Sequence, residues 1–275
     1  MAESGTVAIT FIRHGESEDN LRPIWAGWRD TPLSELGTKQ VKALGSSLSS
    51  TRFDIILSST LRRAYMTAKA VQEAQHEPKP EILTSLLLRE QTRGIAEGHP
   101  WITEPRLGLS LEEHYAQGLF PIHHERWQKF PGGESLEDLE LRANKAVKEV
   151  ILPHALTLSK VRKPKTHIAV ASHGLLIAEM IPALLKLDPT SSEPHTTYRG
   201  MLNSAWARVT VEIVGGHDRD ERWPDMRVRV TDFNSHAHLN SIVPLSTGSE
   251  KRDSVQTFAG DEEDSIAIQA EQKVN

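Results

Sequence analysis

Cysteine is absent from this chain of 275 residues. Without it the protein can form neither disulfides nor a catalytic thiolate, and it cannot bind zinc or iron–sulfur clusters through cysteine ligands. The absence fits a reducing compartment, so we expect the protein in the cytoplasm, with the nucleus as the alternative. The N-terminal residues MAESGTVAITFIRHG lack a charged segment followed by a long apolar one, so we expect no secretory signal.

Positive charge and long apolar runs are also scarce. The chain has 32 lysines and arginines against 37 acidic residues, which gives a net charge of −5 at pH 7. Because a net negative charge does not favour DNA or an anionic membrane surface, we expect no nucleic-acid partner and no membrane partner. No apolar run approaches the roughly 18 residues that a transmembrane helix needs.

The composition changes near the C-terminus. Residues 1–245 have the mixed apolar and charged composition of a globular protein, and we expect one domain there. Residues 246–275 contain seven acidic side chains, three basic ones and a single aromatic residue, Phe258. Such a segment buries too little apolar surface to offset the entropy lost on ordering, so we expect an acidic, disordered tail.

Short apolar runs alternate with amphipathic segments within residues 1–245. The runs predict strands at 7–12, 54–57, 81–88, 166–171, 205–214 and 226–233. Helices are predicted after Ser34 and Thr60, which can serve as N-caps, after Ser135, where Asp138 completes a near capping box, and over 174–186. Alternating strands and helices indicate an α/β fold with a largely parallel central sheet.

Charged and imidazole side chains follow four of the predicted strands. In chain order these groups are Arg13-His14-Gly15, Arg62-Arg63, Glu90 and His173-Gly174. The carboxyl ends of parallel strands meet at one edge of a sheet, which is where ligands bind in such folds. Taken alone, Arg13-His14-Gly15 could be a strand-to-loop transition, Arg62-Arg63 is equally well explained as a solvated basic pair, and Glu90 is better explained as a surface glutamate. Together they indicate a site for an oxyanion such as phosphate.

These motifs resemble those of the histidine phosphatase superfamily, whose members have the phosphoglycerate mutase-like fold. The resemblance covers nearly all of the predicted domain, and its motifs occur in the family's order. They are Arg13-His14-Gly15-Glu16-Ser17, Ser58-Ser59-Thr60-Leu61-Arg62-Arg63-Ala64, Leu88-Arg89-Glu90, Pro131-Gly132-Gly133-Glu134-Ser135 and Ser172-His173-Gly174. The resemblance implies a three-layer α/β/α sandwich.

The resemblance also implies a role for each matching residue. His14 would be the nucleophile that takes the phosphoryl group, and Glu90 would protonate the leaving oxygen. The groups around the phosphoryl oxygens would be Arg13, Arg63 and His173. Arg63 is chosen over Arg62 because the family's catalytic arginine directly precedes alanine. Substrate-binding positions would be Asn20, Gly27, Ser17 and Gly174. With these groups, neither a metal nor a cofactor is expected.

The phosphate site is shared by phosphatases and mutases, so the distinction depends on other segments. Glu90-Gln91-Thr92-Arg93-Gly94 resembles the phosphatase branch, because cofactor-dependent mutases carry a tyrosine before this glycine. The Pro131–Ser135 motif is common in that branch, which includes fructose-2,6-bisphosphatase-like and broad-specificity members. We therefore expect a metal-independent phosphatase for a small phosphorylated metabolite, with a sugar bisphosphate as one candidate. The alternatives are a mutase, a phosphoprotein phosphatase and a non-catalytic binding protein.

Residues 95–130 form an insertion that is expected to act as a lid and to set substrate specificity. A second phosphate on the substrate would need a basic partner in or beside this insertion. The candidates are Arg93, Arg106, Arg126, His123 and His124. For each of them alone, a place on a lid surface that binds nothing is the favoured explanation. The sequence does not indicate an oligomeric state.

Overall fold

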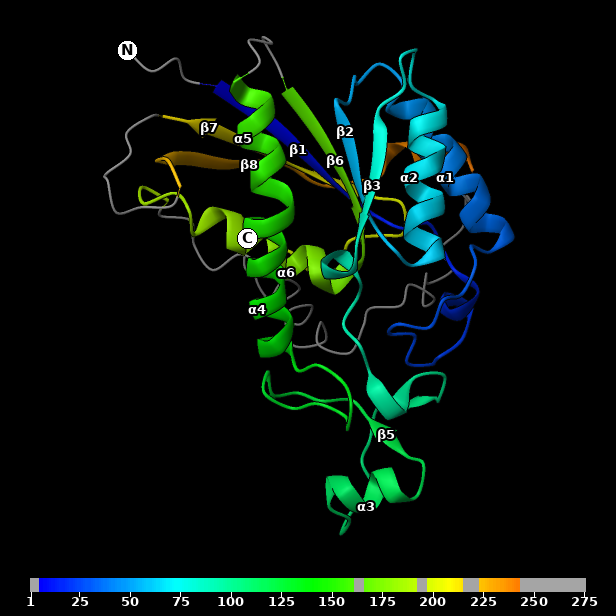
Figure 1. The fold of residues 1–275 in the computed structure, drawn as a ribbon. Helices are drawn as coiled ribbons and strands as arrows, with labels where there is room; N and C mark the ends of the chain where they lie inside the picture. The colour runs from blue at the N-terminus through cyan, green and yellow to red at the C-terminus, as the bar shows by residue number, and fades with distance from the viewer. Residues whose placement is uncertain (1–4, 161–165, 192–196, 215–222, 243–275) are drawn as a thin grey trace, which may run out of the picture.

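Six strands form the central sheet of the protein (Figure 1). The computed structural model describes residues 5–160, 166–191, 197–214 and 223–242, so the predicted tail at 246–275 lies outside the described residues. The strand order is β3 (Glu81–Ser85), β2 (Ile55–Ser59), β6 (Thr166–Ser172), β1 (Gly5–Arg13), β7 (Trp206–Ile213) and β8 (Met226–Ser235). The first four strands are mutually parallel, whereas β7 is antiparallel to β1 and β8 antiparallel to β7. The prediction of a largely parallel α/β sheet is confirmed.

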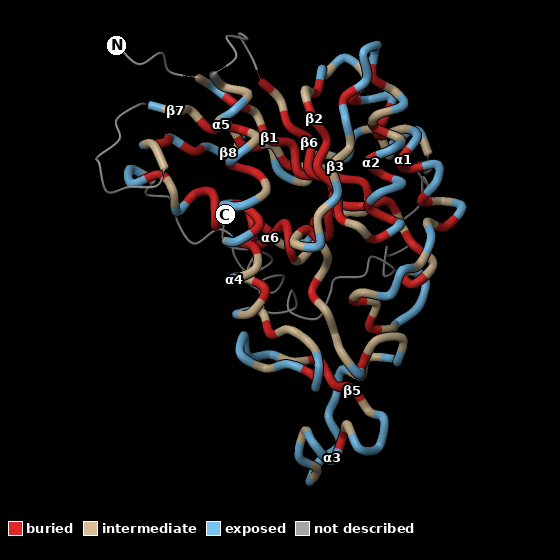
Figure 2. Tube along the Cα trace, in the orientation of Figure 1, coloured by how far each residue is buried: buried red, intermediate tan, exposed pale blue. Residues whose placement is uncertain are grey.

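Helices cover both faces of this sheet. One face carries α1 (Glu35–Ser47) and α2 (Arg62–Glu73); the other carries α4 (Leu136–Ala146), α5 (Leu152–Lys160) and α6 (Gly174–Leu185). Alternate residues of β1 enter different cores: Phe11 packs with α4 and α6, whereas Ile12 packs with α1 and α2. Figure 2 shows the buried residues concentrated along the strands and the inner faces of the helices.

Short helical segments complete the described chain. A π-helical stretch, Val147–Ile151, joins α4 to α5. The 3-10 helices are Glu18–Leu21, Leu86–Leu88, Gly94–Ala96 and Ala237–Ser241. None of the helices in the described ranges is long and apolar enough to cross a membrane.

Two element boundaries differ from the sequence prediction. Helix α2 begins at Arg62, with Leu61 at the N-cap, so the prediction that Thr60 caps it was wrong. The Thr60 hydroxyl instead accepts a hydrogen bond from Arg89 Nε at 2.6 Å. Strand β3 ends at Ser85, where the side chain accepts from Leu87 N and starts a 3-10 turn. The predicted cap Ser34 is confirmed, because its hydroxyl accepts from Gly37 N.

The insertion at 95–130 extends beyond the carboxyl ends of the parallel strands (Figure 1). It contains β4 (Trp101–Ile102), α3 (Leu111–Ala116) and β5 (Phe120–Pro121), and β4 pairs with β5 in parallel. A separate apolar cluster holds it together; its buried members are Trp25, Ala96, Phe120, Ile122 and Phe130. The insertion therefore packs through its own small core at the edge of the sheet where the predicted site residues lie.

The capping box of α4 gives a stability prediction. The hydroxyl of Ser135 accepts from Asp138 N at 3.0 Å, and the carboxylate of Asp138 accepts from Ser135 N at 3.1 Å. Ser135→Ala is expected to lower the free energy of unfolding by about 1 kcal/mol, because a helix N–H loses its acceptor. Urea denaturation measures the change. Ser46 is an exposed residue of α1, and Ser46→Ala serves as the control that should change stability little. Equal effects of the two variants would contradict the capping role of Ser135.

Candidate active site

The ends of β1 and β6 bring two histidines together. Arg13 and Ser172 are register partners in these neighbouring parallel strands, so the residues that follow, His14 and His173, leave the sheet side by side. Their ring centroids lie 5.0 Å apart. Both imidazoles are buried. Glycine follows each histidine. An added Cβ on Gly15 would lie 2.9 Å from Gly37 O, which leaves no room for a side chain, whereas one on Gly174 would make ordinary contact with Arg13 Nε at 3.5 Å.

The two nitrogens of the His14 imidazole have different partners: one contacts a backbone carbonyl and the other faces Arg63. Its Nδ1 lies 2.7 Å from the carbonyl oxygen of Gly15, and because a carbonyl only accepts, Nδ1 carries the proton. Nε2 is then the lone-pair nitrogen, and it accepts from Arg63 Nε at 3.3 Å. Burial, followed by the charges of Arg63 and Arg13, lowers the pKa of His14 well below its ordinary value of 6.5. The ring is therefore neutral at physiological pH, with Nε2 able to act as a nucleophile.

Arg63 is held by the backbone of the loop that precedes α1. Only 2% of the residue is exposed, and its guanidinium donates to Gly27 O at 2.9 Å and to Arg29 O at 2.8 Å. Gly27 has φ +50°, and an added Cβ there would meet the carboxylate of Glu97 at 2.3 Å. Arg62, by contrast, is exposed. The structure thus places Arg63, and not Arg62, beside His14, with Gly27 as an anchor of that arginine.

His173 has a buried nitrogen without a partner. Its Nε2 shares a hydrogen bond of 2.8 Å with the hydroxyl of Ser59, whereas Nδ1 is buried and has no hydrogen-bond partner within the described structure. Burial, followed by the charge of Arg63, lowers the pKa of His173 well below 6.5. Ser59 was present in the motif at the end of β2, but the sequence did not show that it would orient this imidazole.

The segment from 201 to 205 closes one side of the cluster. The guanidinium of Arg13 donates to the carbonyl of Met201, and Asn203 Nδ2 donates to His14 O at 3.1 Å. Asn20 Oδ1 accepts from both the amide and the hydroxyl of Ser17, at 3.0 and 2.9 Å, and it lies 3.4 Å from Asn203 Nδ2. Ser17 and Asn20 therefore shape the loop after β1. Sequence reasoning missed Asn203, which follows no strand and matches none of the motifs.

Glu90 approaches the cluster from the end of β3. Its carboxylate accepts from Gln91 N at 2.9 Å and from Leu175 N and Leu176 N at 3.3 Å each, at the positive N-terminus of α6. Burial lowers the pKa of Arg63, and the charge of Glu90 is the largest effect that opposes this. All five predicted groups at the strand ends, Arg13, His14, Arg63, Glu90 and His173, thus lie at one edge of the sheet.

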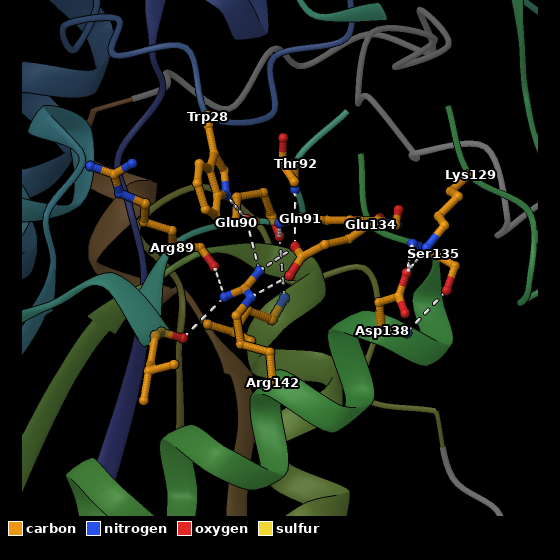
Figure 3. A network of polar contacts seen from close by, with 12 residues as sticks. Trp28, Arg89, Glu90, Gln91, Thr92, Lys129, Glu134, Ser135, Asp138 and Arg142 are labelled. Carbon is orange, nitrogen blue, oxygen red and sulfur yellow. Dashed lines mark hydrogen bonds and ion pairs between the residues drawn. The ribbon is translucent and has the colours of Figure 1, made fainter. Parts of the chain in front are cut away.

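An ion pair holds the backbone on both sides of Glu90 (Figure 3). Arg142 of α4 contacts both carboxylate oxygens of Glu134, at 2.6 and 2.7 Å, and the two side chains are only 12% and 18% exposed. The same guanidinium donates to the carbonyls of Leu87, Arg89 and Glu90 at 3.0, 2.7 and 2.9 Å. Glu134 belongs to a motif noted in the sequence, but Arg142 was missed because it lies in the middle of a helix.

The arrangement suits a tetrahedral oxyanion. Buried cations, a neutral imidazole whose lone-pair nitrogen faces Arg63 and an unpartnered imidazole nitrogen meet beside a carboxylate that can exchange a proton. Within the described residues, no group of three or more histidine or acidic side chains is placed to hold a metal ion.

Comparison with known proteins identifies the family. Residues 9–210 match the histidine phosphatase superfamily, branch 1. Because this match spans most of the chain, the protein belongs to that superfamily. Among similar proteins is the 2,3-bisphosphoglycerate-dependent phosphoglycerate mutase of Sinorhizobium fredii, 32% identical over 67% of this chain and 81% of the relative. The corresponding mutase of Brucella melitensis is 31% identical over 66% and 82%.

Solved structures with the same fold include both phosphatases and a mutase. A mycobacterial glucosyl-3-phosphoglycerate phosphatase, solved with VO3, is 27% identical over 83% of this chain and 99% of its own, with a TM-score of 0.58. A phosphoglycerate mutase from Bacillus anthracis shares 23% identity over 86% and 96% of the chains, with a TM-score of 0.59. The fold is therefore phosphoglycerate mutase-like, as the sequence resemblance predicted.

The charge of Arg63 gives a prediction about His14. Arg63→Gln is expected to raise the pKa of His14, because it removes a nearby positive charge that opposes protonation. The pKa should remain below 6.5, since burial is the larger cause of its lowering. Histidine ¹H–¹⁵N correlation spectra across a pH series measure it. Arg62→Gln is the matched control, and the same His14 titration in both variants would contradict the coupling.

The Arg142 network gives a second prediction. Arg142→Lys keeps the charge but removes the planar fork that joins Glu134 to three carbonyls. We expect the free energy of unfolding to fall by about 2 kcal/mol, because buried acceptors lose their donors. Amide hydrogen exchange should also become faster in residues 87–92. Lys145→Gln, at an exposed position of the same helix, serves as control, and unchanged exchange in Arg142→Lys would show that the network does not hold this loop.

Proposed function

We propose that the protein is a metal-independent phosphatase that hydrolyses a phosphate monoester of a small metabolite through a phosphohistidine on His14. The observation that carries the proposal is the neutral, buried His14 with Nε2 facing Arg63. A neutral imidazole nitrogen can attack phosphorus, and the guanidinium beside it stabilises the charge that develops on the phosphoryl oxygens.

The reaction follows in two steps. In the first, His14 Nε2 forms a bond to phosphorus, the bond to the leaving oxygen breaks, and Glu90 donates a proton to that oxygen. In the second, Glu90 takes a proton from water, whose oxygen attacks phosphorus and releases inorganic phosphate and free His14. Arg13, Arg63 and His173 Nδ1 are the donors for the phosphoryl oxygens. Gly174, Gly27, Asn20 and Ser17 support this pocket through the backbone and loop contacts described above.

Two observations favour hydrolysis of a small metabolite. The segment after Glu90 resembles the phosphatase branch, and a phosphatase for glucosyl-3-phosphoglycerate is among the similar structures above 25% identity. The insertion at 95–130 extends past the strand ends that carry the site, which favours a substrate of limited size.

A mutase is the second candidate. The curated relatives that are 31–32% identical are phosphoglycerate mutases. A mutase would use the same phosphohistidine but return the phosphoryl group to another hydroxyl of the substrate, which requires that water be kept out of the pocket.

Phosphate release by the purified protein in EDTA tests the proposal. We expect His14→Ala to lose activity on the order of a thousandfold or more, because no other group can form the covalent intermediate. The exposed His76 provides the control, and His76→Ala should retain full activity. The panel holds 3-phosphoglycerate, fructose-2,6-bisphosphate, phosphoserine, phosphotyrosine and p-nitrophenyl phosphate.

The outcomes separate the candidate functions. Isotope exchange between phosphoglycerates without net phosphate release would favour the mutase. Preference for phosphotyrosine would favour a phosphoprotein substrate. Activity that persists in His14→Ala, or that EDTA removes, would contradict the phosphohistidine mechanism.

A further inference from the structure

Arg93 is a cation fixed close to the candidate active site. It lies three residues after Glu90, and its backbone N–H donates to Glu97 Oε1 at 3.0 Å. The next residue, Gly94, has φ +52°, and an added Cβ there would meet Pro131 O at 2.2 Å, so the turn is tightly constrained. The guanidinium of Arg93 lies over the ring of Trp25, 4.6 Å from its centroid.

Trp25 is itself immobilised. It is buried in the apolar core of the insertion, where its ring packs edge-on against Phe130 and its Nε1 donates to Phe120 O at 3.1 Å. Stacking on this ring occupies one face of the Arg93 guanidinium and leaves the N–H groups at its edge for other partners. In the described part of the chain, no hydrogen-bond acceptor for that guanidinium is found.

Arg93 keeps its positive charge in these surroundings, and the positive charge of Arg199 acts on it. Burial lowers the pKa of Arg93 to about 10, while Glu90 and Glu97 oppose the shift and Arg199 adds to it. The group is therefore protonated near pH 7. Arg199 precedes the segment that contacts the site through Met201 and Asn203. Arg199 is thus a second positive charge close enough to act on Arg93.

The other basic residues predicted for a second phosphate are less suitable. The guanidinium of Arg126 is engaged by both carboxylate oxygens of Glu179 and by Glu140, each at 3.1 Å. Burial lowers the pKa of His123 to about 4, so this imidazole is neutral, and its Nε2 contacts Tyr115 OH. Arg106 and His124 are exposed.

From this arrangement we propose that Arg93 binds a second anionic group of the substrate whose phosphoryl group reaches His14. The inference rests on the proposed function and narrows its substrate class to phosphate monoesters that also carry a carboxylate or another phosphate. An anion would supply the acceptors that the half-buried guanidinium lacks, and charge-assisted hydrogen bonds to its planar edge would orient the substrate.

Matched substrate pairs test this assignment. 3-Phosphoglycerate and glycerol 3-phosphate differ by a carboxylate, and fructose 1,6-bisphosphate and fructose 6-phosphate differ by a phosphate. In at least one pair, the wild-type protein is expected to prefer the member that carries the second anionic group by about tenfold or more in kcat/KM. Arg93→Gln should bring that ratio close to one and leave kcat/KM for p-nitrophenyl phosphate within about twofold. The pair whose preference is lost in Arg93→Gln shows whether the second anion is a carboxylate or a phosphate.

Controls keep the result specific. Arg229→Gln, on the exposed surface of β8, should preserve the ratio. Equal losses of Arg93→Gln on all substrates, or no wild-type preference in either pair, would overturn the inference. If no substrate releases phosphate, the proposed function fails, but equilibrium binding of the same pairs to wild type and Arg93→Gln still decides whether Arg93 binds the second anion.

Discussion

The guanidinium of Arg63 is buried beside a neutral imidazole, and this contact sets the conditions that the surrounding structure must meet. A cation removed from water needs acceptors, and here two backbone carbonyls, those of Gly27 and Arg29, provide them. That requires a turn with Gly27 in a left-handed conformation. The positive charge adds to the effect of burial in keeping His14 unprotonated. The placement of one arginine therefore constrains the loop geometry and contributes to the protonation state of the proposed nucleophile.

Glu97 connects the loop that holds Arg63 to a second loop through hydrogen bonds. One of its carboxylate oxygens accepts from Trp28 N, from Arg93 N and from the hydroxyl of Thr92. It thereby joins the loop that holds Arg63 to the loop that follows Glu90. A change in either loop is expected to alter the other, because a single half-buried acceptor serves both. The proposed phosphoryl-binding end of the site and the proposed second-anion end are thus parts of one hydrogen-bonded unit.

Acidic and basic groups lie close together in this unit. The charges of Glu90 and Glu97 act on Arg63 and Arg93, and Glu134 pairs with Arg142. Arg63, Arg142 and Glu134 are largely removed from water. Breaking one buried pair would leave its partner uncompensated, which costs more than the pair itself contributes. Such networks favour one arrangement of the loops over alternatives, which is what the proposed alignment of a phosphoryl group with His14 requires.

The amino-acid sequence alone determined the α/β architecture and the chemistry at the strand ends. Buried strands are short apolar runs, and a residue that follows such a run must lie at the sheet edge, so His14, Glu90 and His173 could be placed from local patterns. The tertiary structure decided what long-range contacts control: the pairing of Arg142 with Glu134, the approach of Asn203 to His14, and the use of Thr60 as an acceptor for Arg89 instead of a cap. It also singled out Arg93 among the predicted cations, because burial, stacking and competing ion pairs depend on residues far apart in the chain. Local sequence patterns indicate the helix or strand in which a residue lies and the face on which it lies. Its hydrogen-bond partners and its protonation state depend on the distant groups that pack around it and exclude water.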